Sequence, residues 1–298
     1  AEHGEGFWTD HWTYNLDLIE SYLAIFPENW KKILLGSKEY TFYDNDHRVL
    51  PRSEKYHLKK DGCVRQYKAV VKEKEKAVLL AARDKESALV RTRSGKGDVY
   101  RTTLFVKLLC LFTNKFASLD PGGMGVEMEA DKPSWYDALN GLPGLLGSSL
   151  PETFELKRLS IFLLDSLDAL KVDGNDGPAL PAELYEFVEK LERSLKKLFT
   201  AGDPKNERAG FIFWDEVSAA KEKFRCDTFF GVSGKEKKIT FGRIKLYLEH
   251  AREKIQIGLE KAFNEKTGLY PTYFENEMVR YKKDKESVKP LEFKQKPL

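Results

Sequence analysis

The sequence predicts a mainly α-helical protein, and two observations support this fold class. Apolar residues recur at three- and four-residue intervals, the spacing of one helix face; over residues 183–199 they are Leu184, Phe187, Val188, Leu191, Leu195 and Leu198. Segments that are apolar on nearly every face, such as residues 101–119, alternate with segments that carry one apolar stripe. This alternation indicates an inner layer of helices within an outer layer, and helical hairpins arranged in this way build an (α/α)6 toroid.

Helix-start and helix-stop signals divide the chain. The first helix covers residues 10–26 and ends at Pro27, which cannot continue it. A short helical turn follows at residues 30–35. Ser149 and Glu152 have the spacing of a capping box, which predicts the start of a long apolar helix. The longer helices are expected over residues 74–92, 101–119, 151–170, 183–199, 207–225 and 242–263.

Two regions depart from the helical pattern. Residues 37–72 mix aromatic and polar residues with turn signals, so we expect an irregular insertion with a short hairpin at Asp61-Gly62. The basic segment 282–298 has few apolar residues and is expected to be a loose extension of a single helical domain, residues 1–281. Because the predicted helices fall short of six pairs, either the barrel is incomplete or further helices lie in residues 37–72 and 226–241.

Composition excludes several classes of partner. The 50 basic and 47 acidic residues nearly cancel, which gives no electrostatic case for a nucleic acid or an anionic membrane. No apolar run reaches the ~20 residues of a membrane span. The three cysteines, Cys63, Cys110 and Cys226, lack metal-ligand spacing, so we expect no metal and a reduced, cytoplasmic compartment. The start lacks both Met and a signal-peptide pattern, from which we expect a processed chain or a piece of a longer one.

The most informative segment for chemistry is residues 125–159. Trp135, Tyr136 and Asp137 combine flat apolar rings with one proton donor. A sugar uses both, because its C–H face stacks on a ring while its bridging oxygen must be protonated before it leaves. Asp137 is therefore a candidate general acid, whose pKa the neighbouring rings would raise by desolvation. The alternative is a surface Asp that caps a short helix.

The string DKPSWYDALNGLPGLLGSS resembles the motif G-D-W-N-D-G-M-N-x-V-G-x-x-G-x-G-E-S of glycoside phosphorylases of the cellobiose phosphorylase type. Trp135, Asp137 and Asn140 stand at the motif's Trp, general acid and Asn, and Gly144 and Gly147 at its later glycines. The resemblance implies an (α/α)6 catalytic domain that cleaves a β-glucoside by inverting phosphorolysis. It implies inorganic phosphate as co-substrate and no other cofactor.

The chain departs from this family at several positions. Ser134, Tyr136 and Ser148 stand where the motif has its first Asp, an Asn and a Glu. The opening string GEGFWTDHWTYNLDLIESYLAIFPE is similar to a catalytic-barrel helix of large cellobiose phosphorylase-like proteins, but Thr9 precedes Asp10 where that family has an Arg-Asp pair. These departures leave room for altered chemistry.

A second functional group decides between phosphorolysis and hydrolysis. An inverting hydrolase needs a carboxylate to activate water. Glu127 and Glu129 alternate in GVEMEA and would share one face of a strand, and Asp10 is a further candidate base. A phosphorylase needs hydroxyls and cations for phosphate instead. Ser148 and Ser149 are candidate phosphate ligands, together with the N–H groups that begin the next helix.

The N-terminal aromatic cluster is a candidate sugar subsite. Trp8, Asp10 and His11 offer a ring, a carboxylate and an imidazole close to Trp12 and further polar side chains. The alternative is a helix that buries its aromatic residues. The expected partners are an oligosaccharide, inorganic phosphate and, for an incomplete barrel, other segments or chains that complete it. A non-catalytic carbohydrate-binding or assembly fragment remains a third alternative beside the phosphorylase and the hydrolase.

Overall fold

Helix α4 (Leu104–Phe116) lies inside the helical layer of the computed structural model, which describes residues 11–129, 141–200, 203–284 and 287–298. Thr103 caps the helix by accepting a hydrogen bond from the Val106 N–H. The Phe112 ring is 5.8 Å from that of Phe116 and meets Tyr247 edge-on at 6.0 Å. The expectation that the all-apolar segment forms an inner helix is confirmed.

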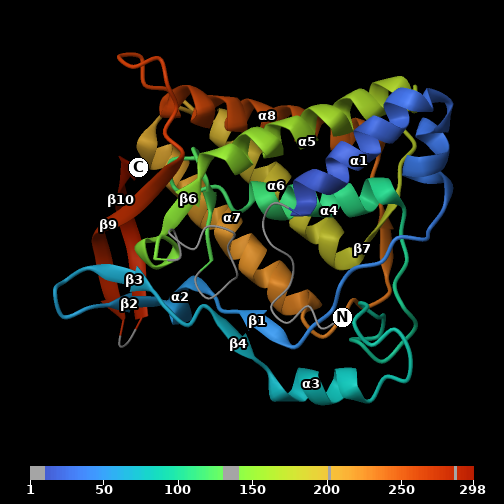
Figure 1. Cartoon of the computed structure of the whole chain (residues 1–298), viewed down its shortest axis with the longest axis horizontal. Helices are drawn as coiled ribbons and strands as arrows, with labels where there is room; N and C mark the ends of the chain where they lie inside the picture. The colour runs from blue at the N-terminus through green and yellow to red at the C-terminus, as the bar shows by residue number, and fades with distance from the viewer. Residues whose placement is uncertain (1–10, 130–140, 201–202, 285–286) are drawn as a thin grey trace.

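Longer helices surround α4. In Figure 1, α5 (Leu150–Ala169) and α8 (Phe241–Ala262) run side by side along the top, and α1 (His11–Ile25) lies along α5. Below them, α6 (Ala182–Thr200) packs against α7 (Glu207–Thr228). Each of these helices lies within a few residues of its predicted range, so the protein is mainly helical.

The predicted helix over residues 74–92 is much shorter in the structure. Helix α3 (Lys74–Ala81) ends early, and the chain then turns, with Glu86 at a φ of +48°. The guanidinium of Arg83 donates to the backbone oxygens of Ser87 and Leu89. These bonds hold the chain in turns, so the charged periodicity that suggested a helix reflects an exposed loop.

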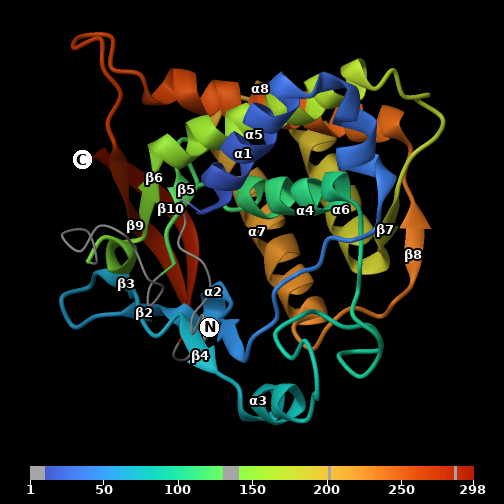
Figure 2. The same ribbon diagram turned by 45° about the vertical axis from the view of Figure 1, so that its right-hand side comes forward.

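Short strands build the rest of the fold. Residues 37–72 are ordered into two antiparallel pairs, β1–β4 and β2–β3, and the hairpin at Asp61-Gly62 is confirmed. Residues 226–241 hold only the end of α7 and the first residue of α8, so no additional helix lies there. The β7–β8 pair lies on the opposite side of the molecule from the larger sheet (Figure 2). The remaining elements are η1 (Pro27–Asn29), η2 (Lys32–Gly36), β1 (His47–Val49), α2 (Arg52–Lys55), β2 (Tyr56–Leu58), β3 (Val64–Gln66), β4 (Val70–Lys72), β5 (Val126–Glu127), η4 (Pro143–Leu145), β6 (Gly147–Ser149), β7 (Ala179–Pro181), β8 (Glu236–Lys238), β9 (Tyr273–Asp284) and β10 (Ser287–Pro297).

The segment 282–298, expected to be a loose extension, is instead part of the largest sheet. Its strand β10 pairs with β9 along its length, in the sheet order β10-β9-β6-β5. Val288 is buried against Tyr56 and Met278, while Lys289 and Lys294 point outward. The period-2 pattern was concealed because register shifts between Pro290 and Phe293 interrupt the alternation.

The capping box predicted for α5 is also absent. The Ser149 side chain makes no capping bond, and the Leu150 N–H donates to the backbone oxygen of Thr272. Glu152 pairs with Lys115 at 3.0 Å. Tertiary contacts therefore satisfy the helix start that the local sequence would have capped. Among the described residues, no helix is both long enough and apolar enough to cross a lipid bilayer.

Candidate functional site

The described residues on either side of 130–140 meet at one edge of the largest sheet. Strands β5 and β6 pair antiparallel, and the Met128 N–H donates to the Gly147 oxygen at 2.9 Å. A Cβ at position 147 would lie 2.3 Å from Leu142 Cγ, so glycine is required there. The chain therefore enters residues 130–140 and returns from them beside this pair of strands.

Several predicted site residues fall outside the described part of the chain. They are Trp8, Asp10, Trp135, Tyr136, Asp137 and Asn140, together with the side chain of His11. The roles expected for them stay predictions. The described residues that flank them can be assessed directly.

Glu127 and Glu129, the candidate bases, both lie against basic side chains at the end of β5. Glu127 accepts a hydrogen bond from the Trp214 indole at 2.7 Å, and Lys221 Nζ is 3.5 Å from its other oxygen. Glu129 is held between Lys55 and Arg225, with Arg225 at 2.8 Å. The two carboxylates are brought together, as the alternation predicted, and both are engaged in an ionic cluster.

Electrostatics give the members of this cluster different proton affinities. Burial opposes the charged form of Glu129, but Lys55, Arg225 and Lys221 outweigh it and hold the pKa of this carboxyl well below its usual range. A carboxylate with a depressed pKa is a weak general base. Burial lowers the pKa of Lys221 to about 8, although Glu127 opposes the shift. The protein therefore keeps Glu129 ionised.

A second set of ion pairs extends the cluster along α7. Arg52 bonds to Glu222 at 2.9 Å and to Asp215 at 2.8 Å, and its guanidinium lies 4.9 Å from the centre of the Trp214 ring. Sequence reasoning missed these basic residues. One signal was present, because Lys221 continues the buried stripe of α7 that includes Trp214. A lysine on an apolar stripe indicates a buried partner.

A cavity of about 530 Å³ adjoins the ionic cluster. Glu222 and Arg225 line it from α7, and Tyr43, His47 and Glu54 line it from the insertion. Its volume lies within the range of about 300–1,000 Å³ typical of small-molecule sites, and aromatic and polar side chains are mixed in its wall. Arg225 links it to Glu129, so a ligand in the cavity would lie next to the ionic cluster.

Ser148 and Ser149, the candidate phosphate ligands, lie in the buried strand β6 between β5 and β9. Ser148 is completely buried; its hydroxyl donates to Asp120 at 2.6 Å and accepts from Asn276 at 3.1 Å. The first N–H of α5 is likewise occupied. This geometry engages the Ser148 hydroxyl inside the fold, and a phosphate role for Ser149 stays a prediction.

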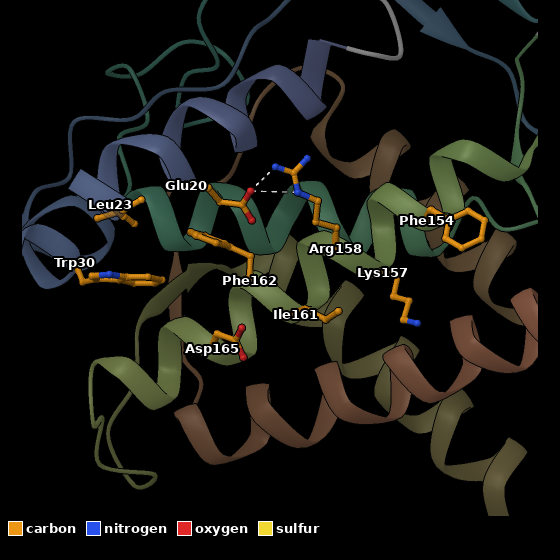
Figure 3. A pocket seen from close by; sticks show the side chains of 10 residues that line it. Glu20, Leu23, Trp30, Phe154, Lys157, Arg158, Ile161, Phe162 and Asp165 are labelled. Carbon is orange, nitrogen blue, oxygen red and sulfur yellow. Dashed lines mark hydrogen bonds and ion pairs between the residues drawn. The ribbon is translucent and has the colours of Figure 1, made fainter. Parts of the chain in front are cut away.

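The described part of the N-terminal cluster divides between core and surface. Trp12 is buried, with Lys115 Nζ 5.5 Å from its ring centre, as expected of a helix that buries its aromatic residues. A groove of about 460 Å³ runs between α1 and α5 (Figure 3). There the Trp30 ring stacks on Phe162 at 5.6 Å. The groove offers an aromatic surface, and its lining comes from the helical layer and Trp30, with no residue of β5 or β6.

Comparison with known proteins identified no family and no similar sequence. No protein-family model matches the chain, and no curated protein sequence is significantly similar to it. Within the described ranges, no group of three or more His, Cys, Asp or Glu side chains is arranged to hold a metal ion.

Proposed function

We propose that this chain is a carbohydrate-active domain that cleaves a β-glucoside by inverting phosphorolysis. Asp137 would donate its proton to the bridging oxygen as the bond from that oxygen to the anomeric carbon breaks. A phosphate oxygen would form the new bond to the anomeric carbon from the opposite face. The products would be a free sugar and a sugar 1-phosphate, with the proton from Asp137 on the leaving hydroxyl.

The observation that carries this proposal is the state of Glu129. Its carboxylate is paired with Lys55 and Arg225, and its pKa is depressed, so it is poorly suited to take a proton from water. Glu127 is hydrogen-bonded to Trp214. Because Glu127 and Glu129 already bind other side chains, neither is free to activate water. A nucleophile that is already anionic, such as phosphate, therefore suits the site better than water does.

The surroundings of the ionic cluster support the same reaction. Arg225 is 29% exposed and lines the adjoining cavity, so it is the cluster cation best placed to meet an anion there. Tyr43 offers a ring and Glu54 a polar group for sugar hydroxyls. Glu129, which is paired with Arg225, directly precedes the segment that contains Asp137.

A toroid remains part of the proposal. The inner helix α4 and the antiparallel pair α6–α7 are elements that an (α/α)6 barrel would contain. Helix α1 supports a second candidate, a domain that needs another segment or chain to complete the barrel. Leu18 and Ile25 on α1 are about 70% exposed, and a helix that is apolar on opposite faces is usually covered on both.

Turnover of β-glucobioses with and without inorganic phosphate tests the proposal. We expect phosphate-dependent formation of sugar 1-phosphate that is lost in Asp137→Asn. Asp84→Asn is the matched control, because Asp84 is an exposed carboxylate in the turns after α3. Glucose release that does not depend on phosphate would favour the hydrolase, with Asp10 or Glu127 as base. Sugar binding without turnover would favour the binding or assembly module.

A further inference from the structure

Lys254 on α8 is a largely buried cation that, among the described residues, has no carboxylate within ion-pairing distance. Lys254 is 4% exposed. Within the described residues its ammonium makes no hydrogen bond and no ion pair. The nearest ring is that of Phe213, centred 6.0 Å away. The carboxylate of Asp120 acts on Lys254 only at a distance, since it accepts from the N–H groups of Met124 and Gly125 and from a serine hydroxyl.

Holding an ammonium in this state is costly, because the side chain has lost much of its hydration and no acceptor among the described residues replaces it. Burial lowers the pKa of Lys254 to about 8, with Asp120 opposing the shift. A fold that needed only an apolar filler here could have used methionine or leucine. Asp120 offsets this cost only in part, which leaves the charge able to attract an anion from outside the chain.

The ammonium reaches a cavity of about 770 Å³ at one end of the molecule. The cavity lies between the C-terminal part of α8, the start of α7, the turn at Pro121-Gly122 and the β9–β10 hairpin; the two strands and the end of α8 lie at the left in Figure 1. Gly123 leaves room for the lysine, because a Cβ there would lie 2.4 Å from Lys254 Nζ. Its φ of +73° also favours glycine.

The cavity wall carries more positive than negative charge. Its basic residues are Lys205, Arg208, Lys254, Lys261 and Arg280, and its acidic residues are Glu207 and Glu292. The two glutamates are already paired, with Lys261 at 3.7 Å and with Arg280 at 3.4 Å. Among the described residues Arg208 has no ion pair, so its charge is available to a ligand together with that of Lys254.

The start of α7 adds backbone donors to the same wall. Asn206 caps the helix by accepting from the Ala209 N–H. The N–H groups of Glu207 and Arg208 have no acceptor among the described residues, and both residues line the cavity. The first N–H groups of a helix carry partial positive charge and bind phosphate oxygens well.

We propose that this cavity binds a phosphate-type oxyanion, either inorganic phosphate or a phosphate monoester. The Lys254 ammonium donates to it from below, and Arg208 and the start of α7 donate from the rim. The volume exceeds what a single phosphate group fills, so an organic substituent has room. This site does not depend on the proposed phosphorolysis.

Isothermal titration of the whole chain with inorganic phosphate and, separately, with glucose 6-phosphate tests the site. We expect Lys254→Met to weaken binding more than about tenfold, the loss of one charge-assisted hydrogen bond, and Arg208→Gln to weaken it by about threefold. Lys245→Met is the matched control on the same helix; Lys245 pairs with Asp168 outside the cavity. It should bind as the unaltered chain does. Tighter binding of one probe identifies the source of the phosphate group.

Two results would overturn the site. One is the absence of saturable binding of both probes to the unaltered chain. The other is binding that persists in Lys254→Met and Arg208→Gln but disappears in Lys221→Met, which would assign the anion to the ionic cluster. If Lys254→Met does not fold, as judged by circular dichroism, Arg208→Gln decides, because Arg208 is on the surface.

Discussion

The helical layer and the region around the β10-β9-β6-β5 sheet bury different kinds of side chain. Around α4 the buried residues are almost all apolar, with Phe112, Phe116 and Tyr247 in mutual contact. Beside the sheet the apolar cluster is small, and polar groups such as the buried Ser148 and the 10%-exposed side chain of Glu129 lie next to it. Apolar packing tolerates many substitutions, whereas buried polar groups need particular partners. The region around the sheet, which has the stricter requirements, also holds the described residues on either side of 130–140.

The largest effect is expected in the helical layer. Phe112 is fully buried, so Phe112→Ala should lower the free energy of unfolding by about 4 kcal/mol through lost transfer energy and a residual cavity. Urea unfolding measures the change. Leu246→Ala on α8 is the control, since Leu246 is 47% exposed and should cost much less. Equal losses in the two variants would contradict the assignment of α4 to the inner layer.

Breaking the ionic cluster should come next. Glu129→Gln leaves Lys55 and Arg225 without their shared counter-charge and should cost about 3 kcal/mol. The same unfolding experiment applies. The double variant Lys55→Met with Glu129→Leu removes both buried charges and should recover much of the loss. If the double variant is no more stable than Glu129→Gln, the pair is not the source of the effect.

Removing one buried hydroxyl from each region compares how much a single polar group contributes to the unfolding free energy. Ser148→Ala removes a bond to the buried carboxylate of Asp120, and we expect a loss of about 2 kcal/mol. Ser160 is equally buried, but its hydroxyl donates to the Lys157 oxygen within α5. Such back-bonding contributes little to a helix, so Ser160→Ala should be nearly neutral. Similar losses would mean that the polar region is no more demanding than the helical layer.

The smallest effect, counted per pH unit, is a pH dependence of the unfolding free energy. Lys221 and Lys254 have folded-state pKa values of about 8, below the ~10.4 of an unfolded chain. Between these values the unfolded state binds more protons, so the unfolding free energy should rise with pH by roughly 1 kcal/mol per pH unit per lysine. Lys254→Met should flatten the profile between pH 8 and pH 10. An unchanged slope would show that Lys254 titrates normally.

The sequence predicts the helices of the helical layer because their apolar residues recur at regular intervals. The stripe that includes Leu184, Leu191 and Leu198 identifies α6 without reference to the rest of the chain. The polar region depends on long-range partners: Glu129 meets Lys55 and Arg225, which lie far away along the chain. Their pairing leaves no local signal. The capping box failed for the same reason, because Thr272 satisfies the start of α5.

Strand β10 shows a different limit. Its outward residues are mostly charged, and the alternation that buries Val288 is interrupted by a register shift between Pro290 and Glu292. The basic composition of residues 282–298 therefore suggested a loose extension. An alternating pattern that allows for one β-bulge would have predicted a strand. For the candidate site, the alternation of Glu127 and Glu129 predicted their shared surroundings, but not that cations would engage both.

The most direct test of the proposed reaction is the configuration of the sugar phosphate formed from a β-glucobiose. ³¹P and ¹H NMR of the purified chain with inorganic phosphate should show an α-sugar 1-phosphate, because phosphate attacks opposite the departing oxygen. The resonances should be absent with Asp137→Asn. Formation of glucose at the same rate without phosphate, or of the β-anomer of the sugar phosphate, would contradict inverting phosphorolysis.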